Sequence, residues 1–232
     1  MSENAVKPMS EKLKGMAAVI VMIAIMAAVF WNSDAISWHE FVWLGLFFGM
    51  SLIRAPFGMQ NRQNKVTVSE NHLWEKLLLL GMFLSMGLVP LIYLATKQTN
   101  ADIFGFADYT LPDFASWIGA AMILPFFYLF WRSHSDLGRN WSAKLEIHSE
   151  QTLVTNGIYK FVRHPMYLAL WLAVIAQALL IHNWIAGFMV IVIFLAMYLS
   201  RIQQEEAMMR AQFGSDYDVY TKQTGRILPK LF

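Results

Sequence analysis

Six apolar stretches without a single charged residue constrain the fold of this chain more than any other feature. They cover residues 15–31, 41–53, 77–95, 114–131, 166–181 and 184–200. A helix that spans the hydrocarbon core of a bilayer needs about 20 predominantly apolar residues, with a range of about 17–25. Several stretches lie at or below the lower edge of that range, which implies tilted helices or a locally thinned bilayer. The pattern predicts an all-α, polytopic membrane protein with about six transmembrane helices.

The scarcity of charge supports a lipid environment. Of the 232 residues, 57% are hydrophobic and 15% are charged, whereas a soluble domain carries about 25% charged residues. The net charge of +2 and the lack of a basic tract with interleaved aromatics argue against nucleic-acid binding. The chain has no cysteine, which excludes disulfides, cysteine-ligated zinc and a thiol nucleophile. We expect the lipid bilayer as a partner and no nucleic acid. Because the histidines lack the spacing of a helical ligand pair, we also expect no metal.

The placement of Lys and Arg predicts the topology. Basic residues follow the second, fourth and sixth apolar stretches, whereas the alternate loops contain only Lys97 among several acids. Positive residues favour the cytoplasmic side of a membrane. Both termini, the 132–165 loop and the C-terminal tail are thus predicted to be cytoplasmic, which requires an even number of crossings. No convincing cleavage site follows the first stretch, so we expect a retained anchor. The last two stretches, separated only by His182 and Asn183, predict a tight helical hairpin.

Two polar stretches flank this hairpin on the predicted cytoplasmic side, and the return of the chain can make residues near 163 and near 205 neighbours. Pro165 suits the first position of a helix because its missing N–H would be unpaired there, which puts His164 at the N-cap. The free N–H groups of that helix end favour an anion, and the guanidinium of Arg163 can hold a carboxylate through two hydrogen bonds. Arg201 and Glu205 are four residues apart on the helix that continues from the membrane.

Each of these residues also has an ordinary structural interpretation. Arg163 can anchor the membrane edge as a flanking positive charge, and His164 can serve only as a helix cap. The neighbouring tyrosines can belong to the interfacial aromatic belt. Glu205 and Glu206 can form a solvated face. The order and spacing of all of them together are more specific than any one position.

That pattern is Leu-Val-x-x-Gly-x-Tyr-x-x-x-Arg-His-Pro-x-Tyr at residues 153–167, followed by Arg-Ile-x-x-Glu-Glu at 201–206 and Phe-Gly-x-x-Tyr-x-x-Tyr at 213–220. It resembles the isoprenylcysteine carboxyl methyltransferase and phospholipid methyltransferase superfamily of membrane enzymes. The resemblance runs from about Leu137 to Pro229, and the first four apolar stretches carry no motif. It divides the chain into N-terminal transmembrane helices (1–132) and a methyltransferase-like region (133–232) that contains a cytoplasmic loop, the hairpin and a C-terminal helix.

The resemblance implies S-adenosylmethionine as the cofactor and an active site at the cytoplasmic face. It implies cofactor-binding residues at Val154, Gly157, Tyr159, His164, Tyr167 and Glu205, and catalytic residues at Arg163 and Glu206. Gln177 and Asn183 match further family positions, whereas Ala169 stands where the family often has Gly.

The implied activity is that of an isoprenylcysteine-type carboxyl O-methyltransferase. Its acceptor would be a lipidic or small molecule that carries a carboxylate or a thiol. A carboxylate needs no general base but needs a cation to hold it, and Arg163 fits that role. An amine or thiol would have to lose a proton, for which Glu206 or His164 are candidates. A phospholipid N-methyltransferase, a membrane reductase of related architecture and a non-catalytic membrane protein remain alternatives.

Overall fold

The computed structural model of the protein describes residues 9–61, 66–69, 73–142, 146–148 and 151–230. Its α-helices are α1 (Met9–Trp31), α2 (Trp38–Asn61), α3 (Leu73–Phe83), α4 (Val89–Thr96), α5 (Asp113–Leu137), α6 (Pro165–Leu180), α7 (Met189–Phe213) and α8 (Ser215–Gln223). Two π-helical segments, η2 (Leu84–Leu88) and η6 (Trp184–Phe188), precede α4 and α7. Short 3-10 turns are η1 (Ser33–Ala35), η3 (Gly105–Ala107), η4 (Gly138–Asn140) and η5 (Gly157–Lys160). Strands β1 (Val66–Ser69) and β2 (Glu146–His148) pair antiparallel.

The predicted all-α fold is confirmed in its coarse form, because the six apolar stretches lie in helical structure, apart from Ile181 at the C-cap of α6. Within the described residues, the segments long and apolar enough to cross a membrane are Trp38–Phe57, Leu73–Thr96, Asp113–Asn140 and Trp184–Phe213. The apolar helices Ile20–Trp31 and Pro165–Leu180 are shorter. The shortest predicted stretch, 41–53, lies within a longer helix, because α2 continues through Arg54 and Pro56. The count of six crossings stays a prediction. Four lysines and arginines near the apolar stretches lie outside the described residues: Lys7, Arg62, Lys65 and Lys144.

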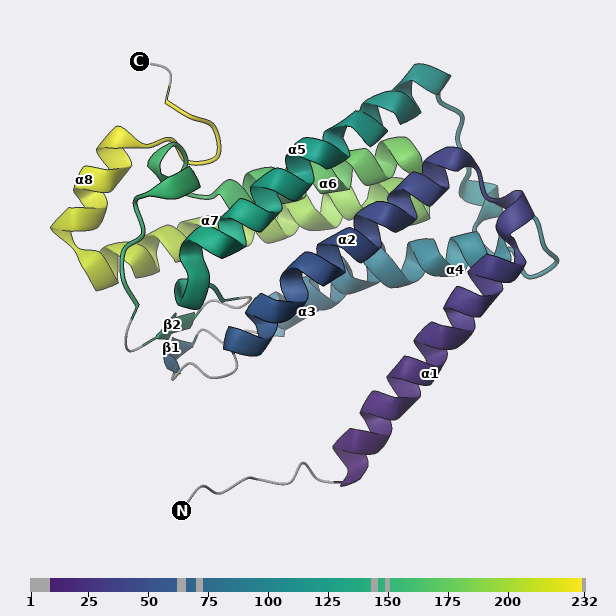
Figure 1. The fold of residues 1–232 in the computed structure, drawn as a ribbon, viewed down its shortest axis with the longest axis horizontal. Helices are drawn as coiled ribbons and strands as arrows, with labels where there is room; N and C mark the ends of the chain where they lie inside the picture. Colours follow the sequence, from purple (N-terminus) through teal and green to yellow (C-terminus); the bar gives the residue numbers. More distant parts are fainter. Residues whose placement is uncertain (1–8, 62–65, 70–72, 143–145, 149–150, 231–232) are drawn as a thin grey trace.

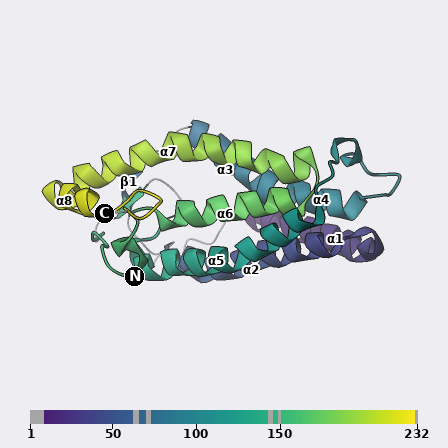
Figure 2. The same ribbon diagram turned by 90° about the horizontal axis from the view of Figure 1, so that it is seen from above.

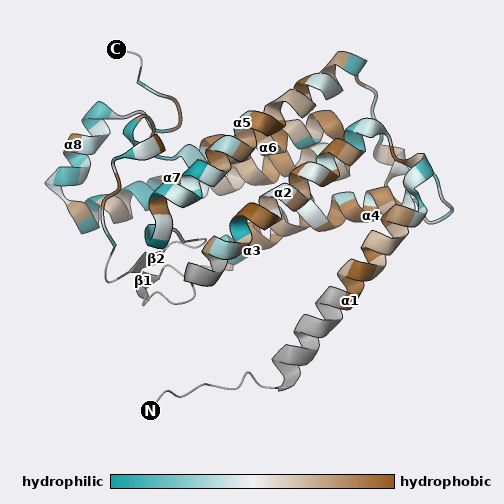
Figure 3. Cartoon of the chain, in the orientation of Figure 1, coloured by the Kyte–Doolittle hydropathy of each residue, from teal (hydrophilic) through white to brown (hydrophobic). Residues whose placement is uncertain are grey.

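The helices form an elongated bundle with α6 in its middle. Helix α6 packs against α5, α7 and α2, and α3 packs against α7. Seen from above, α7 and α3 lie on one side of α6, and α5 and α2 lie on the other (Figure 2). Helix α1 contacts α4 and diverges from the bundle toward the N-terminus, while α8 and the two strands gather at the opposite end from the α1–α2 connection (Figure 1). Hydrophilic residues are concentrated on α8 and its neighbours, and hydrophobic residues along the bundle (Figure 3).

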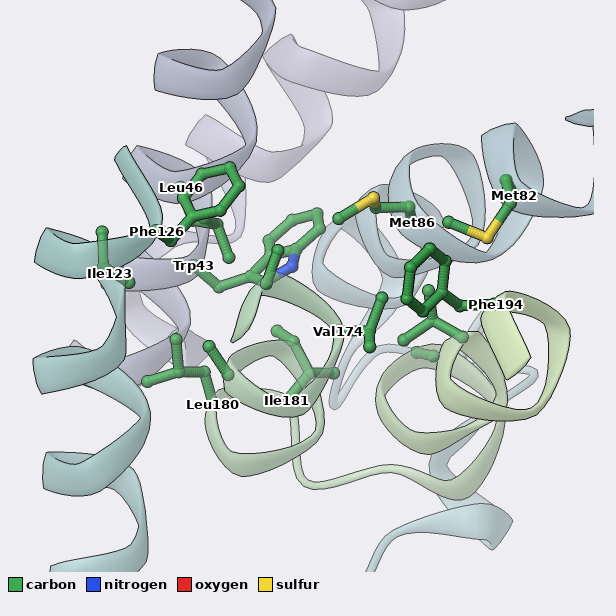
Figure 4. Packing of buried hydrophobic residues seen from close by; sticks show 14 of the residues in the cluster. Trp43, Leu46, Met82, Met86, Ile123, Phe126, Val174, Leu180, Ile181 and Phe194 are labelled. Carbon is green, nitrogen blue, oxygen red and sulfur yellow. The ribbon is translucent and has the colours of Figure 1, made fainter. Parts of the chain in front are cut away.

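Large apolar side chains from five of the helical segments fill the core (Figure 4). They include Trp43 and Leu46 of α2, Met82 of α3, Phe126 of α5, Val174 and Leu180 of α6, and Phe194 of α7, each no more than 9% exposed. Apolar side chains on the outside, such as Leu124 and Leu199, are well exposed. An apolar exterior around an apolar core is what helices in lipid require.

Pro90 explains a polar cross-link inside the bundle. Because Pro90 has no N–H, the carbonyl of Ser85 loses the donor that continued π-helical bonding would supply. The buried Gln177 side chain donates from Nε2 to Ser85 O at 2.8 Å and to Ala186 O at 2.9 Å. Ser85 lies in η2 and Ala186 in η6. One side chain of α6 therefore satisfies carbonyls in both π segments, which gives Gln177 a structural role.

Asn183 ends the connection between α6 and η6. Its Oδ1 accepts hydrogen bonds from the N–H groups of Ile185 and Ala186 at 3.0 and 2.9 Å, and its Nδ2 donates to Asp108 at 2.8 Å. Asn183 is thus the N-cap of η6, in the short connection after α6. The turn lets α6 and α7 run back along one another, so that residues near 163 and near 205 become neighbours.

Candidate active site

A cavity of about 660 Å³ is lined by residues of α2, α3, α6, α7 and α8 and of the segment before α6. Its charged and polar lining includes Arg54, Tyr159, Arg163, His164, Arg201 and Glu205, and its apolar lining includes Phe47, Met50, Met82, Met86, Phe130 and Leu170. Small-molecule sites typically measure about 300–1,000 Å³ and combine mostly apolar walls with a few polar groups. The cavity therefore has the size and the composition of a binding site for an amphiphilic ligand.

The cavity brings together most of the residues singled out in the sequence. Val154, Tyr159, Arg163, His164, Tyr167 and Glu205 all line it, whereas Gly157 and Glu206 do not. Ala169, the departure from the family pattern, is fully buried within the core packing of α6 and does not line the cavity. Its extra methyl group thus affects helix packing and leaves the cavity wall unchanged.

Gly157 lies outside the cavity and fixes the conformation of the loop that leads to it. Its φ is +58°, and an added Cβ would collide with the carboxylate of Asp136. That carboxylate accepts the N–H of Ile158 at 2.8 Å and pairs with Arg132 at 2.9 Å. Glycine is needed here for both its left-handed backbone and its lack of a side chain. In this structure Gly157 lies against Asp136 and does not line the cavity.

Tyr159 connects three segments around the cavity. Its hydroxyl donates to Ser133 O of α5 at 3.1 Å, and its carbonyl accepts from the hydroxyl of Tyr220 on α8 at 2.6 Å. Val162 then forms a parallel bridge with Gly225. These contacts hold the 157–164 segment between α5 and the C-terminal tail, so the cavity wall is anchored on both sides.

His164 occupies the N-cap of α6, with Pro165 at the first helical position, as the sequence predicts. Its backbone N–H donates to Arg226 O at 2.9 Å. The imidazole Nδ1 lies 3.6 Å from Glu205 and Nε2 lies 3.4 Å from Glu206. Burial lowers the pKa of this imidazole, but the two carboxylates outweigh burial and raise the pKa above its ordinary value. The ring therefore stays protonated to a higher pH than a free histidine.

Arg163 directs most of its donors at the protein itself. Nε and Nη2 donate to Glu206 Oε1 at 3.2 and 2.9 Å, while Nη1 donates to the carbonyls of Thr224 and Thr221. A guanidinium has five N–H groups, so one of them remains for a ligand in the cavity. The two parallel hydrogen bonds to an acceptor carboxylate that the sequence suggested are not available in this arrangement, because Glu206 and the tail carbonyls already occupy those donors.

Glu205 and Glu206 have different surroundings, as expected for side chains about 100° apart around a helix. The Glu206 side chain is 4% exposed and accepts from Arg163 and from Arg226, whose Nη2 lies 3.0 Å from Oε2. The Glu205 side chain is 25% exposed, lines the cavity, and accepts from the Tyr167 hydroxyl at 2.7 Å. The predicted pair of Arg201 with Glu205 is confirmed at 3.3 Å.

Several residues of the site were not identified from the sequence. Asp136 and Arg226 hold the loop and the tail in place, and Arg54 and Trp141 contribute to the cavity lining. Arg54 lies on α2, outside every motif, and no sequence spacing links it to the C-terminal region. Within the described residues, no group of three or more His, Cys, Asp or Glu side chains is arranged to hold a metal ion.

Comparison with known proteins gives the same family that the motifs suggested. Residues 118–211 match the family model described as "Isoprenylcysteine carboxyl methyltransferase (ICMT) family". This match begins inside α5, covers the whole segment that leads to α6, then α6, η6 and α7 up to residue 211 with both glutamates, and it ends before α8.

Individual relatives are similar over part of the chain. The "Protein-S-isoprenylcysteine O-methyltransferase" of Schizosaccharomyces pombe is 29% identical over 82 residues, which are 35% of this chain and 35% of that protein. The "Probable protein-S-isoprenylcysteine O-methyltransferase" proteins of Oryza sativa subsp. indica and subsp. japonica are each 25% identical over 118 residues, covering 50% of this chain and 62% of theirs. The matched part thus spans about a third of the first relative and less than two thirds of the other two.

Proposed function

We propose, from the premise that residues 118–211 belong to the isoprenylcysteine carboxyl methyltransferase family, that this chain is an integral-membrane methyltransferase. The proposed donor is S-adenosylmethionine, and the proposed acceptor is a lipidic or small molecule that carries a carboxylate. The observation that carries this proposal is the cavity, in which Arg163, His164 and Glu205 meet an apolar wall formed by α2 and α3. Polar groups on one side suit the cofactor, and an apolar wall suits a hydrocarbon tail that enters from the bilayer.

The residues present fit the proposed donor. The buried atom Tyr217 Oη has no hydrogen-bond partner among the described residues, and its side chain lines the cavity. Buried polar atoms without partners are rare and call for a ligand or an ordered water. Glu205 supplies an accessible carboxylate, and Tyr159 and Tyr167 supply aromatic rings that stabilise cations. When bound, S-adenosylmethionine supplies a methyl group on a positively charged sulfur.

Positioning is the main contribution that the chain can make to such a transfer. A carboxylate acceptor is already nucleophilic, so the protein has to orient it and exclude water. We propose that Val154, Tyr159, His164, Tyr167 and Glu205 bind the cofactor. Arg163 stands beside the reacting centre, and Glu206 keeps its guanidinium in place. Gly157 then acts through the loop conformation. A thiol or amine acceptor would instead require a base, for which Glu205 is the accessible carboxylate in the cavity.

Methyl-transfer assays test the proposed function directly. Purified protein is incubated with radiolabelled methyl donor and a panel of prenyl-cysteine, phospholipid and small thiol acceptors. We expect label in the prenyl-cysteine fraction as a base-labile ester. Label only in a phospholipid would assign the alternative N-methyltransferase activity, and failure to bind the cofactor would leave a non-catalytic membrane protein.

We further propose that residues 1–132 provide membrane helices and one wall of the cavity, and that residues 133–232 form the methyltransferase region. In this proposal α6 and α7 are the two arms of a membrane hairpin, six helices cross the bilayer, and both termini and the cavity mouth are cytoplasmic. The basic residues in alternate loops support this orientation. A reporter that is active only outside the cytoplasm, fused after Phe232, should give no signal. Strong activity of that reporter would reverse the proposed orientation.

Replacement of His164 by Ala is expected to weaken binding of the cofactor or of its demethylated product. A hydrogen bond to a charged group contributes about 1.5–3 kcal/mol, which corresponds to a loss of about 10–150-fold in affinity. Calorimetry in detergent measures this affinity, and the thermal unfolding midpoint serves as the folding control. Unchanged affinity in a folded variant would reduce His164 to its role as the N-cap of α6.

A further inference from the structure

Arg54 is an exposed cation near the C-terminal end of α2, and it lacks an acidic partner among the described residues. It belongs to the candidate span Trp38–Phe57 of α2, and it lines the cavity. The other basic side chains of the lining, Arg163, His164 and Arg201, all lie within 4 Å of a carboxylate. Among the described residues, no carboxylate lies within ion-pair distance of Arg54.

Trp141 adds a second donor next to this cation. The Arg54 guanidinium lies 5.4 Å from the centre of the Trp141 ring. The indole Nε1 of Trp141 is buried without a hydrogen-bond partner among the described residues, and the side chain also lines the cavity. A charged donor with no carboxylate and an indole donor with no acceptor, both judged among the described residues, thus lie close together on the wall of the cavity. This is the arrangement that binds a carboxylate.

We propose that Arg54, supported by the indole N–H of Trp141, binds the carboxylate of the methyl acceptor. The proposal rests on the proposed function and specifies how that same site selects an acidic acceptor. Arg54 stands on the α2 wall beside Phe47 and Met50, where an apolar tail can pack. The groups assigned to the cofactor come instead from the 153–167 segment and α7. Arg163 has one N–H left, so Arg54 is the cation with free bidentate capacity.

The reaction balances without further groups. A carboxylate oxygen forms the new bond to the methyl carbon, the bond between that carbon and the sulfonium sulfur breaks, and its electron pair stays on sulfur. The products are a methyl ester and a neutral thioether, and no proton moves. Arg54 takes no part in the bond changes. It is a binding residue that orients the acceptor, so its loss should affect acceptor binding and selectivity more than cofactor binding.

A matched pair of ligands tests this assignment. Binding of N-acetyl-S-farnesylcysteine and of its carboxamide is measured in detergent, with the demethylated cofactor product present. The wild-type protein should prefer the acid by about tenfold or more, since a hydrogen-bonded charge pair contributes about 10–150-fold. Arg54→Gln should remove this preference by weakening the acid alone, and Arg54→Lys should retain part of it. Affinity for the demethylated product should stay within about twofold.

Lys76→Gln is the control, because Lys76 is an exposed cation on α3 that does not line the cavity. This variant should prefer the acid over the carboxamide as strongly as the wild type does. A preference for the acid that survives Arg54→Gln would overturn the role of Arg54 and leave the proposed function intact. A wild-type protein that binds acid and amide equally would overturn both. Loss of affinity for the demethylated product in Arg54→Gln would assign this cation to the cofactor and overturn the acceptor assignment.

Discussion

Replacing Glu206 by Ala should lower the stability of the folded protein far more than replacing its neighbour Glu205. The Arg163 side chain is 9% exposed and would lose its carboxylate. Removing one partner of a buried ion pair costs about 3–5 kcal/mol, because the remaining charge stays buried and unpaired. We expect a value near the lower end, about 3 kcal/mol, because Arg226 is half-exposed and can turn to water.

Glu205→Ala is the matched control for this prediction. Its side chain faces the cavity, and its removal should lower the unfolding midpoint less while weakening cofactor binding, because Arg201 keeps its ion pair with Glu75 at 3.8 Å. Thermal unfolding of both variants in detergent, followed by tryptophan fluorescence, separates the two outcomes. A stable Glu206→Ala protein that has lost only cofactor affinity would show that Glu206 serves the ligand and not the fold.

Arg163→Lys should lower turnover by tenfold or more, with near-normal expression and cofactor binding. Lysine keeps the positive charge and can still reach lipid headgroups, so a role as a membrane anchor would survive the change. A single ammonium, however, cannot donate at once to Glu206 and to the carbonyls of Thr224 and Thr221, as the planar guanidinium does. The tail would shift relative to α6, and displacement of the reacting groups by about 1 Å can cost about a hundredfold in rate.

Arg226→Lys provides the comparison, since Arg226 also binds Glu206 but is 49% exposed. Exposed ion pairs contribute about 0–1 kcal/mol, so the effect of this change on turnover should be several-fold smaller. Single-turnover kinetics with a saturating methyl donor measure both variants. Wild-type turnover in Arg163→Lys would mean that the geometry of the guanidinium is unimportant and that the residue only contributes charge.

Much of the fold and part of the site follow from the sequence alone, because they depend on local interactions. Uncharged apolar stretches predict helices, since only internal hydrogen bonding satisfies a backbone in lipid. Pro165 and His164 define the start of α6, and Asn183 defines the turn before α7, through capping rules that act within a few residues. The spacing of Arg201 and Glu205 likewise predicts their ion pair, because residues four apart meet on a helix.

The tertiary structure alone decided which groups face the cavity. The family resemblance assigns both Arg163 and Glu206 to the reacting centre. In the structure, the rotation of α7 turns Glu205 into the cavity and Glu206 toward three arginines. Glycine is required at position 157 because Asp136, twenty-one positions earlier in the chain, leaves no space for a side chain there. Arg54 comes from a helix with no recognisable motif and reaches the site only because α2 packs beside α5 and α6. Rotation and packing of helices depend on contacts between distant segments, and a local pattern of residues carries no record of them.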